Sequence, residues 1–470
     1  MIARHTLTYV GSRGVGAALN MASLAVFTRL APVEAYGGYL LMLSWALVLY
    51  GATCQWPKFS FFALYEEARA PDQVGTVVRL LGAMIALAAL AAALGAWLGI
   101  VAPAAAAAIV AAVLGMMVFE GACEIARTRL EVGAVAAAIV LRAILVLVLG
   151  SGVLLWTGHA VDLLLATALA NILAALSPLF AIGPLLGGRG SWAEARRLLS
   201  YGWPLVLSFA AAALAQTIDR LIIGQSVGVA ELGAYGAFSD FLRQSFVVFG
   251  DSIALALVSI AKREARSGGM EAARPVLEGA ARLMTLIAAF GGVFFLAFDD
   301  LVVAILLGPD YRAAALGVAP LLVAASVLLM LRSYYFGQVI YFSASSRLDA
   351  VASVTLLITI TGLSAVLIPP YGITGAAIAV VVGQALACLV FIVGDPSGIR
   401  MPVPWRDVSI IAATALACRL AIGWIEASGA GRTVPAVVLE LVILLFGAGA
   451  MAWRFDILGV ATLIRRRRGT

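Results

Sequence analysis

Four charged residues lie within apolar stretches near the middle of the chain. Asp219 and Arg220 interrupt the run SFAAAALAQTIDRLIIGQ (208–225), and Asp240 and Arg243 lie in the next apolar run. Side chains at positions i and i+3 share one helix face, so Asp240 and Arg243 can pair. An arginine keeps its charge, and charges within such stretches usually face a cavity or each other. The aspartates can balance the arginines or carry a proton.

The composition indicates the environment of these charges. Of the 470 residues, 63% are hydrophobic and 12% are charged, and the mean hydropathy is +1.06. A soluble domain is about half apolar and about a quarter charged. The chain is therefore predicted to be an all-α integral membrane protein, with room for roughly a dozen or more spans of about 20 residues. No soluble domain of ordinary size fits between such spans.

Charges, prolines and glycines divide the chain into candidate transmembrane helices. The fourteen expected ranges are 7–29, 38–57, 78–101, 104–121, 134–156, 161–183, 203–223, 234–260, 278–298, 313–336, 349–368, 373–394, 407–425 and 434–453.

The positions of Lys and Arg support this division and predict the orientation. With a cytoplasmic N-terminus, the segments on that side carry 20 Lys or Arg residues, whereas the outer side carries only Arg312 and Arg432, with Arg29 at the boundary. Positive residues favour the cytoplasmic side, so an even number of spans with both termini in the cytoplasm is expected. The basic runs 262–274 and 465–468 are interpreted as anchors beside anionic membrane lipids, and no nucleic-acid partner is expected.

Two segments of the chain resemble each other. FTRLAPVEAYGGYLLM (27–42) and IDRLIIGQSVGVAELGAYGAFSDF (218–241) share an Arg-Leu at a helix end, followed by Glu, Gly and Tyr. The matching residues are Arg29, Glu34, Gly37 and Tyr39 in the first copy, and Arg220, Glu231, Gly233 and Tyr235 in the second. The copies lie six predicted helices apart. This even spacing predicts parallel repeats about an axis along the membrane normal, which is one design of transporters.

The same residues carry a resemblance to a family. YGWPLVLSFAAAALAQTIDRLIIGQSVGVAELGAYGAFSDF (201–241) is similar to the central segment of the polysaccharide and O-antigen flippases, which belong to the multidrug/oligosaccharidyl-lipid/polysaccharide (MOP) exporter superfamily. TRLAPVEAYGGYLLM (28–42), LGPDYRAAALGVAPLLVAASVLLML (307–331) and IPPYGITGAAIAVVVGQ (368–384) resemble the same family in the expected order. Together they extend over most of the chain.

The resemblance implies an architecture. Two pseudo-symmetric six-helix lobes surround a central cavity, and two C-terminal helices follow. The implied parts are an N-terminal lobe (1–185), a cytoplasmic linker (186–202), a C-terminal lobe (203–395), and helices 13 and 14 with a basic tail (396–470).

The resemblance also implies a function. Members of the family move undecaprenyl-pyrophosphate-linked oligosaccharides from the inner to the outer leaflet of the bacterial cytoplasmic membrane, for cell-surface polysaccharide synthesis, by alternating access. Such a protein is not an enzyme and needs no cofactor or metal. Its expected partners are the lipid-linked oligosaccharide and membrane lipids, with polysaccharide polymerase and assembly proteins as further candidates.

The candidate site residues are the polar groups that interrupt the spans. Pyrophosphate candidates are Arg243, Arg220, Arg13, Arg29 and Lys58; coupling or charge-balancing candidates are Asp219 and Asp240; polar cavity-lining candidates are Asn20, Asn171 and Gln216. The four charges of the middle segment are expected to converge in the outer half of the C-terminal lobe. Two alternatives stay open: Asp219 and Arg220 neutralise each other and lock helix seven to helix eight, while Arg29, Lys58 and Arg142 extend to the interface.

Several function classes are disfavoured. The chain has no GxxxxGK[ST] motif and only two lysines, Lys58 and Lys262, so it has no Walker lysine. With His5 and His159 as the only histidines, a His-based metal site or catalytic triad is effectively excluded. A cation-coupled multidrug antiporter of the same superfamily is the first alternative, but it would need buried acids in the first lobe. A glycan polymerase or ligase is the second, but it would need a large outer loop.

Overall fold

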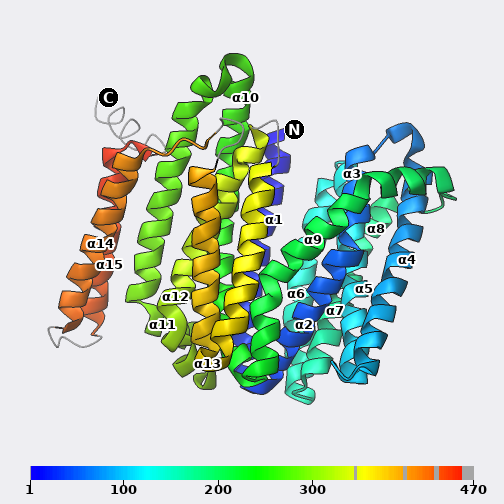
Figure 1. The fold of residues 1–470 in the computed structure, drawn as a ribbon, viewed down its shortest axis with the longest axis horizontal. Helices are drawn as coiled ribbons and strands as arrows, with labels where there is room; N and C mark the ends of the chain where they lie inside the picture. The colour runs from blue at the N-terminus through cyan, green and yellow to red at the C-terminus, as the bar shows by residue number, and fades with distance from the viewer. Residues whose placement is uncertain (1, 343–346, 395–399, 428–432, 458–470) are drawn as a thin grey trace. The chain divides into compact units, whose positions relative to one another are not determined.

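The computed structural model describes residues 2–342, 347–394, 400–427 and 433–457, and all regular structure in these ranges is helical (Figure 1). The α-helices are α1 (Ile2–Leu30), α2 (Val33–Thr53), α3 (Gln55–Leu64), α4 (Ala70–Trp97), α5 (Pro103–Thr128), α6 (Val132–Trp156), α7 (Ala160–Ala174), α8 (Leu176–Ile182), α9 (Trp192–Ser226), α10 (Val229–Ala297), α11 (Asp299–Leu306), α12 (Pro309–Tyr334), α13 (Arg347–Val393), α14 (Trp405–Ala427) and α15 (Val434–Arg454). Short 3-10 helices are η1 (Glu67–Arg69), η2 (Gly183–Leu185) and η3 (Phe336–Tyr341).

The helices account for the predicted spans. In the described ranges, twelve helical segments are long and apolar enough to cross a membrane. One of them, α13, contains the predicted spans 349–368 and 373–394, and the 29-residue α1 contains the predicted span 7–29. The all-α membrane fold with about fourteen spans is thus confirmed. The basic tail at 465–468 and Arg432 lie outside the described residues.

Two long helices are each interrupted by a glycine turn. Helix α10 leaves helical geometry at Gly268 and Gly269, where Gly269 has φ 72° (the hairpin labelled α10 in Figure 1). Helix α13 does so at Gly372, with φ 57°. A positive φ is strained for residues with a Cβ atom, so glycine permits both turns. Each of these turns therefore separates two predicted spans.

Helix α9 starts earlier than predicted. The expected range was 203–223, but the helix begins at Trp192 because Ser191 caps it: the Glu194 amide donates to the Ser191 hydroxyl at 3.1 Å. Serine at the cap with glutamate three residues later is a recognised helix start. Much of the predicted linker 186–202 therefore belongs to the first turns of α9.

Packing divides the chain into two compact units. Unit 1 comprises residues 1–237, 305–314 and 360–376, and unit 2 comprises residues 238–304, 315–359 and 377–470. In unit 1, α1 packs against α6, α5 against α7, and α9 against α2 and α3. In unit 2, buried side chains such as Phe246, Met284 and Met330 form the core, and α14 packs on α15. The predicted lobe boundaries remain a prediction, because these units group segments by packing.

The two repeat copies contact each other within unit 1. A Cβ atom on Gly37 would lie 1.6 Å from the Val229 carbonyl oxygen, and one on Gly233 would lie 2.4 Å from the Val33 carbonyl oxygen. The contact is reciprocal, because each glycine faces the residue four positions before its counterpart. Such reciprocity is what a local two-fold relation between parallel repeats requires. Only glycine lets these two backbones approach so closely.

We predict that Gly37→Ala lowers the stability of the fold. The added methyl group overlaps a backbone carbonyl, which cannot move as a side-chain end can, and overpacking typically costs about 1–3 kcal/mol. The measurement is the thermal unfolding midpoint of the purified full-length protein in detergent. Gly82→Ala on α4 is the matched control, because a Cβ atom there meets nothing within 4 Å. Equal midpoints for the two variants would contradict the prediction.

Candidate functional site

A buried lysine in unit 1 forms part of a polar triad inside helical segments that are long and apolar enough to cross a membrane. The Lys58 ammonium donates to the Tyr50 hydroxyl at 2.8 Å and contacts the Glu120 carboxylate. The Tyr50 hydroxyl also donates to Glu120, at 2.7 Å. The Lys58 side chain is only 8% exposed, whereas the Glu120 side chain is 39% exposed. In this ion pair, the Glu120 carboxylate is therefore accessible, whereas the Lys58 ammonium is enclosed.

Local helix geometry places this triad. Helix α2 ends at Thr53, and α3 begins at Gln55 with Pro57 in its first turn, so the chain bends between Tyr50 and Lys58. Glu120 comes from α5, which packs against both α2 and α3. In a straight helix, residues eight apart lie about 12 Å apart along the axis. The break at Cys54 lets these two side chains reach one carboxylate.

Further charges lie close to the triad. The Arg142 guanidinium of α6 lies 5.1 Å from the centre of the ring of Phe119, the residue next to Glu120 on α5. One turn further along α5, Glu124 pairs with Arg127 at 2.5 Å. Because Glu124 and Arg127 pair with each other, Lys58 and Arg142 remain as two positive charges for the one carboxylate of Glu120. Charges in spans usually face one another or a hydrated space, so this arrangement suits an anionic ligand.

Asp219 and Arg220 are both buried on α9, with exposures of 7% and 6%. The Tyr235 hydroxyl donates to the Asp219 carboxylate at 2.7 Å and so joins α9 to α10. The bond links the helices expected as seven and eight through a tyrosine of the second repeat copy. The alternative in which Asp219 and Arg220 neutralise each other and lock these helices stays a prediction.

Asp240 and Arg243 pair along α10, with 3.1 Å between Arg243 Nη2 and Asp240 Oδ1. Their side chains are 28% and 40% exposed, so Arg243 is the more accessible of the two. The pair belongs to unit 2, whereas Asp219 and Arg220 belong to unit 1. The expected convergence of these four charges therefore stays a prediction.

Arg29 lies near the end of α1 and caps the last residues of α11, which belong to unit 1. Its guanidinium donates to the carbonyls of Ile305 at 2.6 Å and Leu306 at 3.3 Å, which are the last residues of α11. The final carbonyls of a helix lack partners within the helix, and a cation there is favourable. The Tyr311 hydroxyl adds a bond to the Ala31 carbonyl at 3.0 Å. Arg29 thus holds helix ends together in this structure.

The remaining candidates differ in exposure. Arg13 and Gln216 are exposed, Asn20 is half-buried, and Asn171 is buried. The Asn171 amide group donates to the Thr167 carbonyl, and its side-chain oxygen is buried without a hydrogen-bond partner. Asn171 therefore faces the interior of unit 1, whereas Arg13 and Gln216 lie at its surface. Among the described residues, no group of three His, Cys, Asp or Glu side chains could hold a metal ion.

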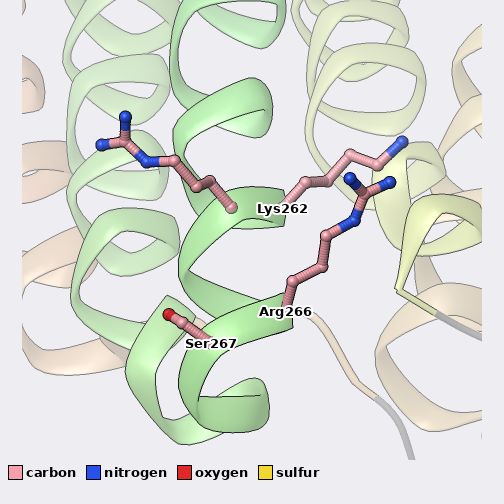
Figure 2. Close-up of a pocket in the computed structure, with 4 residues that line it drawn as sticks. Lys262, Arg266 and Ser267 are labelled. Atoms are coloured by element: carbon pink, nitrogen blue, oxygen red, sulfur yellow. The ribbon is translucent and has the colours of Figure 1, made fainter.

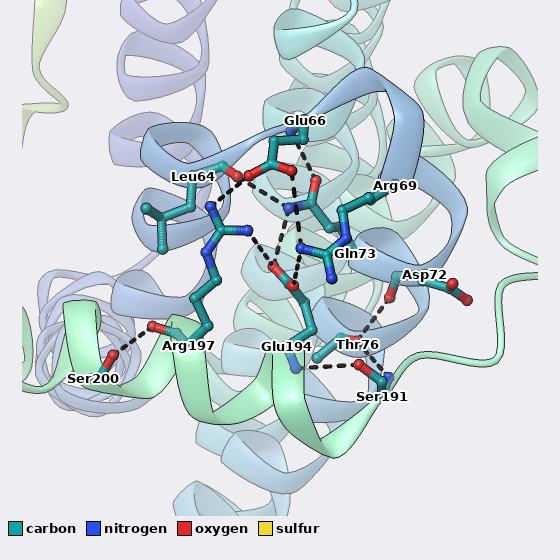
Figure 3. A network of polar contacts seen from close by, with 10 residues as sticks. All are labelled: Leu64, Glu66, Arg69, Asp72, Gln73, Thr76, Ser191, Glu194, Arg197 and Ser200. Carbon is teal, nitrogen blue, oxygen red and sulfur yellow. Dashed lines mark hydrogen bonds and ion pairs between the residues drawn. The ribbon is translucent and has the colours of Figure 1, made fainter.

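Two further polar sites involve predicted cytoplasmic segments. In unit 1, Glu194 accepts a hydrogen bond from Gln73 at 3.0 Å and lies 3.7 Å from both Arg69 and Arg197 (Figure 3). This network ties the start of α9 to the start of α4. In unit 2, Lys262, Arg263, Arg266 and Ser267 line a pocket of about 450 Å³ on α10 (Figure 2). The second site matches the predicted position of a basic anchor.

The comparison with protein families decides the classification. A sequence model described as "Polysaccharide biosynthesis protein" matches residues 73–316, which is more than half of the chain. The chain belongs to this family. It has no significant match among curated proteins.

Solved structures with the same fold agree with this family. The chain superposes on the lipid II flippase MurJ in its inward closed conformation with a TM-score of 0.75 and 10% identity, over 96% of this chain and 98% of that one. An inward-facing multidrug resistance MATE transporter of the MOP superfamily gives 0.63 and 16%, over 80% and 92%. A MOP superfamily transporter from Pyrococcus furiosus gives 0.55 and 16%, over 83% and 93%. These likenesses show that the chain shares its fold with these transporters. The family match confirms the resemblance to polysaccharide-synthesis proteins that was inferred from sequence.

Two residues of the polar triad, Tyr50 and Glu120, were missed from sequence. Glu120 lies in the apolar run AAAAAIVAAVLGMMVFEGAC (104–123) and was taken only as the end of a predicted helix. Glu120 is an acid within a first-lobe span, the part of the chain in which the antiporter alternative would need buried acids. The signal in the sequence was a lone acid inside an apolar run. Helix α5 continues to Thr128, so Glu120 lies eight residues before its end and not at it.

We predict that Lys58 and Glu120 are energetically coupled. Removing one partner of a buried ion pair strands the other charge, which costs about 3–5 kcal/mol when both are fully buried. Because Glu120 is partly exposed, we expect a smaller loss, about 1–3 kcal/mol, for Lys58→Met or Glu120→Gln alone. The double variant should lose less than the sum of the two. Denaturation midpoints of the four proteins in detergent test this, and simple additivity would rule the coupling out.

Proposed function

We propose that the protein is a flippase that translocates an undecaprenyl-pyrophosphate-linked oligosaccharide from the inner to the outer leaflet of the bacterial cytoplasmic membrane. It acts by alternating access, supplies cell-surface polysaccharide synthesis, and has both termini in the cytoplasm. Polysaccharide polymerase and assembly proteins are its candidate partners. The observation that carries the proposal is the family match over more than half of the chain.

The chemistry of the spans supports an anionic headgroup. A pyrophosphate diester carries two negative charges, and moving them through a bilayer is costly without cations along the path. Unit 1 offers Lys58 beside Arg142, and unit 2 offers the half-exposed Arg243. Arginine binds phosphate through two parallel hydrogen bonds, whereas lysine supplies a compact charge. Cationic side chains in both units suit a substrate whose charge must be matched throughout the movement.

A cation-coupled multidrug antiporter is the second candidate. Two observations favour it: the acid Glu120 lies in a span of the first lobe, and the MATE transporter shares the fold with a TM-score of 0.63. Against it, the Glu120 carboxylate is in contact with the Lys58 ammonium. A cationic drug would have to displace that ammonium from a site that carries more positive than negative charge.

The two candidates are separated by deleting the gene in its host and fractionating lipid-linked oligosaccharides by leaflet. Accumulation of finished glycan on the cytoplasmic leaflet, with loss of surface polysaccharide, supports the flippase. Normal arrival of the glycan at the outer leaflet, without polymerisation or transfer, favours a polymerase or ligase. Intact surface glycan with increased sensitivity to cationic drugs favours the antiporter.

We predict that Arg243→Ala reduces export far more than it reduces folding or membrane insertion. The loss of one guanidinium–phosphate contact corresponds to a charge-assisted hydrogen bond of about 1.5–3 kcal/mol, which is roughly a tenfold to hundredfold change. Export is measured by complementing the deletion strain and quantifying surface polysaccharide against the amount of inserted protein. Arg274→Ala is the control, because Arg274 is an exposed arginine of α10 that pairs with Glu278 at 3.0 Å. Wild-type export by a well-inserted Arg243→Ala protein would remove Arg243 from the site.

A further inference from the structure

We propose that Glu120 binds a proton when the substrate's pyrophosphate binds Lys58, so that the lipid-linked substrate and one proton occupy the site together. The inference rests on the proposed function and names the residue that couples transport to a proton. It begins from the triad of Lys58, Tyr50 and Glu120.

In the structure, the Glu120 carboxylate lies where an anionic headgroup would contact Lys58 and Tyr50. It contacts the Lys58 ammonium and accepts the Tyr50 hydroxyl hydrogen bond at 2.7 Å. A phosphate oxygen would accept hydrogen bonds from the same two donors, the Lys58 ammonium and the Tyr50 hydroxyl. The glutamate is thus an internal competitor, and a headgroup reaches Lys58 only by replacing it.

The charge balance decides the fate of the displaced carboxylate. Lys58 and Arg142 supply two positive charges, which a pyrophosphate diester with two negative charges neutralises. An ionised Glu120 would add a third negative charge beside the phosphates. Two unit charges 4 Å apart repel by about 4 kcal/mol at an effective dielectric constant of 20. A bound proton removes this repulsion, and the occupied site is then neutral.

The geometry gives the proton a route. The Glu120 side chain is 39% exposed while Lys58 is only 8% exposed, so the carboxylate can turn outward without carrying the ammonium with it. Glu120 lies eight residues before the end of α5 at Thr128, about 12 Å along the helix axis. In the predicted orientation that end is cytoplasmic. A proton from cytoplasmic water binds a Glu120 oxygen, the ammonium–carboxylate contact breaks, and an ammonium–phosphate contact forms.

The other ionisable groups near Glu120 do not replace it in this role. On the same helix, Glu124 is already paired with Arg127. Tyr50, Cys54 and Cys123 are neutral at physiological pH by their ordinary pKa values and would not take up a proton. Arg142 keeps its charge throughout. None of these groups, which come from α2, α3, α5 and α6, can accept the proton in place of the Glu120 carboxylate.

The experiment uses the full-length protein in phosphatidylcholine nanodiscs and a farnesyl-pyrophosphoryl-N-acetylglucosamine probe. This pyrophosphate diester keeps both negative charges over the neutral pH range, so the probe itself contributes no pH dependence. Probe affinity is measured from acidic to alkaline pH. Uptake of one proton predicts that affinity falls about tenfold for each unit rise in pH over the range in which Glu120 is ionised in the free protein and protonated in the complex.

Two variants separate Glu120 from its surroundings. Glu120→Gln cannot bind the proton, so its affinity for the probe should be flat with pH. Glu124→Gln removes the neighbouring acid of the same helix and should keep the wild-type slope. Should Glu120→Gln fail to fold, calorimetry of the wild type in two buffers of different ionisation enthalpy counts the protons taken up directly, and one proton is expected.

The outcomes are distinct. A wild-type slope that is lost in Glu120→Gln and kept in Glu124→Gln supports the proposal. Probe binding with no pH dependence, or with no proton uptake by calorimetry, overturns it while leaving the flippase function intact. A slope that persists in Glu120→Gln assigns the proton elsewhere and also overturns it. Absence of probe binding at every pH contradicts the proposed function itself.

Discussion

The contact between the Lys58 ammonium and the Glu120 carboxylate lies within segments long and apolar enough to cross a bilayer. Lipid cannot solvate either charge, so each must find its partner in the protein or in a hydrated space. This constraint also explains the other charges of the spans: Asp240 with Arg243, Tyr235 with Asp219, and Arg29 on the carbonyls of α11. Every one of these contacts joins two helices or two turns of one helix. The polar side chains therefore fix how these apolar segments lie against each other.

Close backbone approach is the second device that holds unit 1 together. The reciprocal contacts of Gly37 with Val229 and of Gly233 with Val33 bring the two repeat copies side by side. In lipid, apolar side chains gain little by associating, and small residues allow the tight packing that replaces the hydrophobic effect. Unit 1 also includes residues 305–314 and 360–376, which adjoin or contain predicted outer loops. Contacts among these loop segments and helix ends thus build one compact body from both predicted halves.

The sequence predicted the elements better than their contacts. Composition and charge placement were sufficient for the spans, because a bilayer fixes helix length and loops carry the positive charges. The start of α9 at Trp192 was missed because a capping interaction, rather than hydropathy, extends that helix. Glu120 was missed for a related reason: hydropathy marks an acid as a boundary, and only packing shows that Lys58 lies beside it. Pairing across 62 residues leaves no local pattern.

The pairing of an acid with a lysine in the triad bears on how one fold can bind either cationic or anionic substrates. A lone acid in a span binds either a proton or a cation, so the proton and a cationic substrate compete for it. An acid paired with lysine behaves in the opposite way, because protonation frees the lysine for an anion. The proton and an anionic substrate then bind together. One added cation beside a carboxylate therefore reverses the sign of the coupling without any change in the helices that surround it, which is why Lys58 matters as much as Glu120.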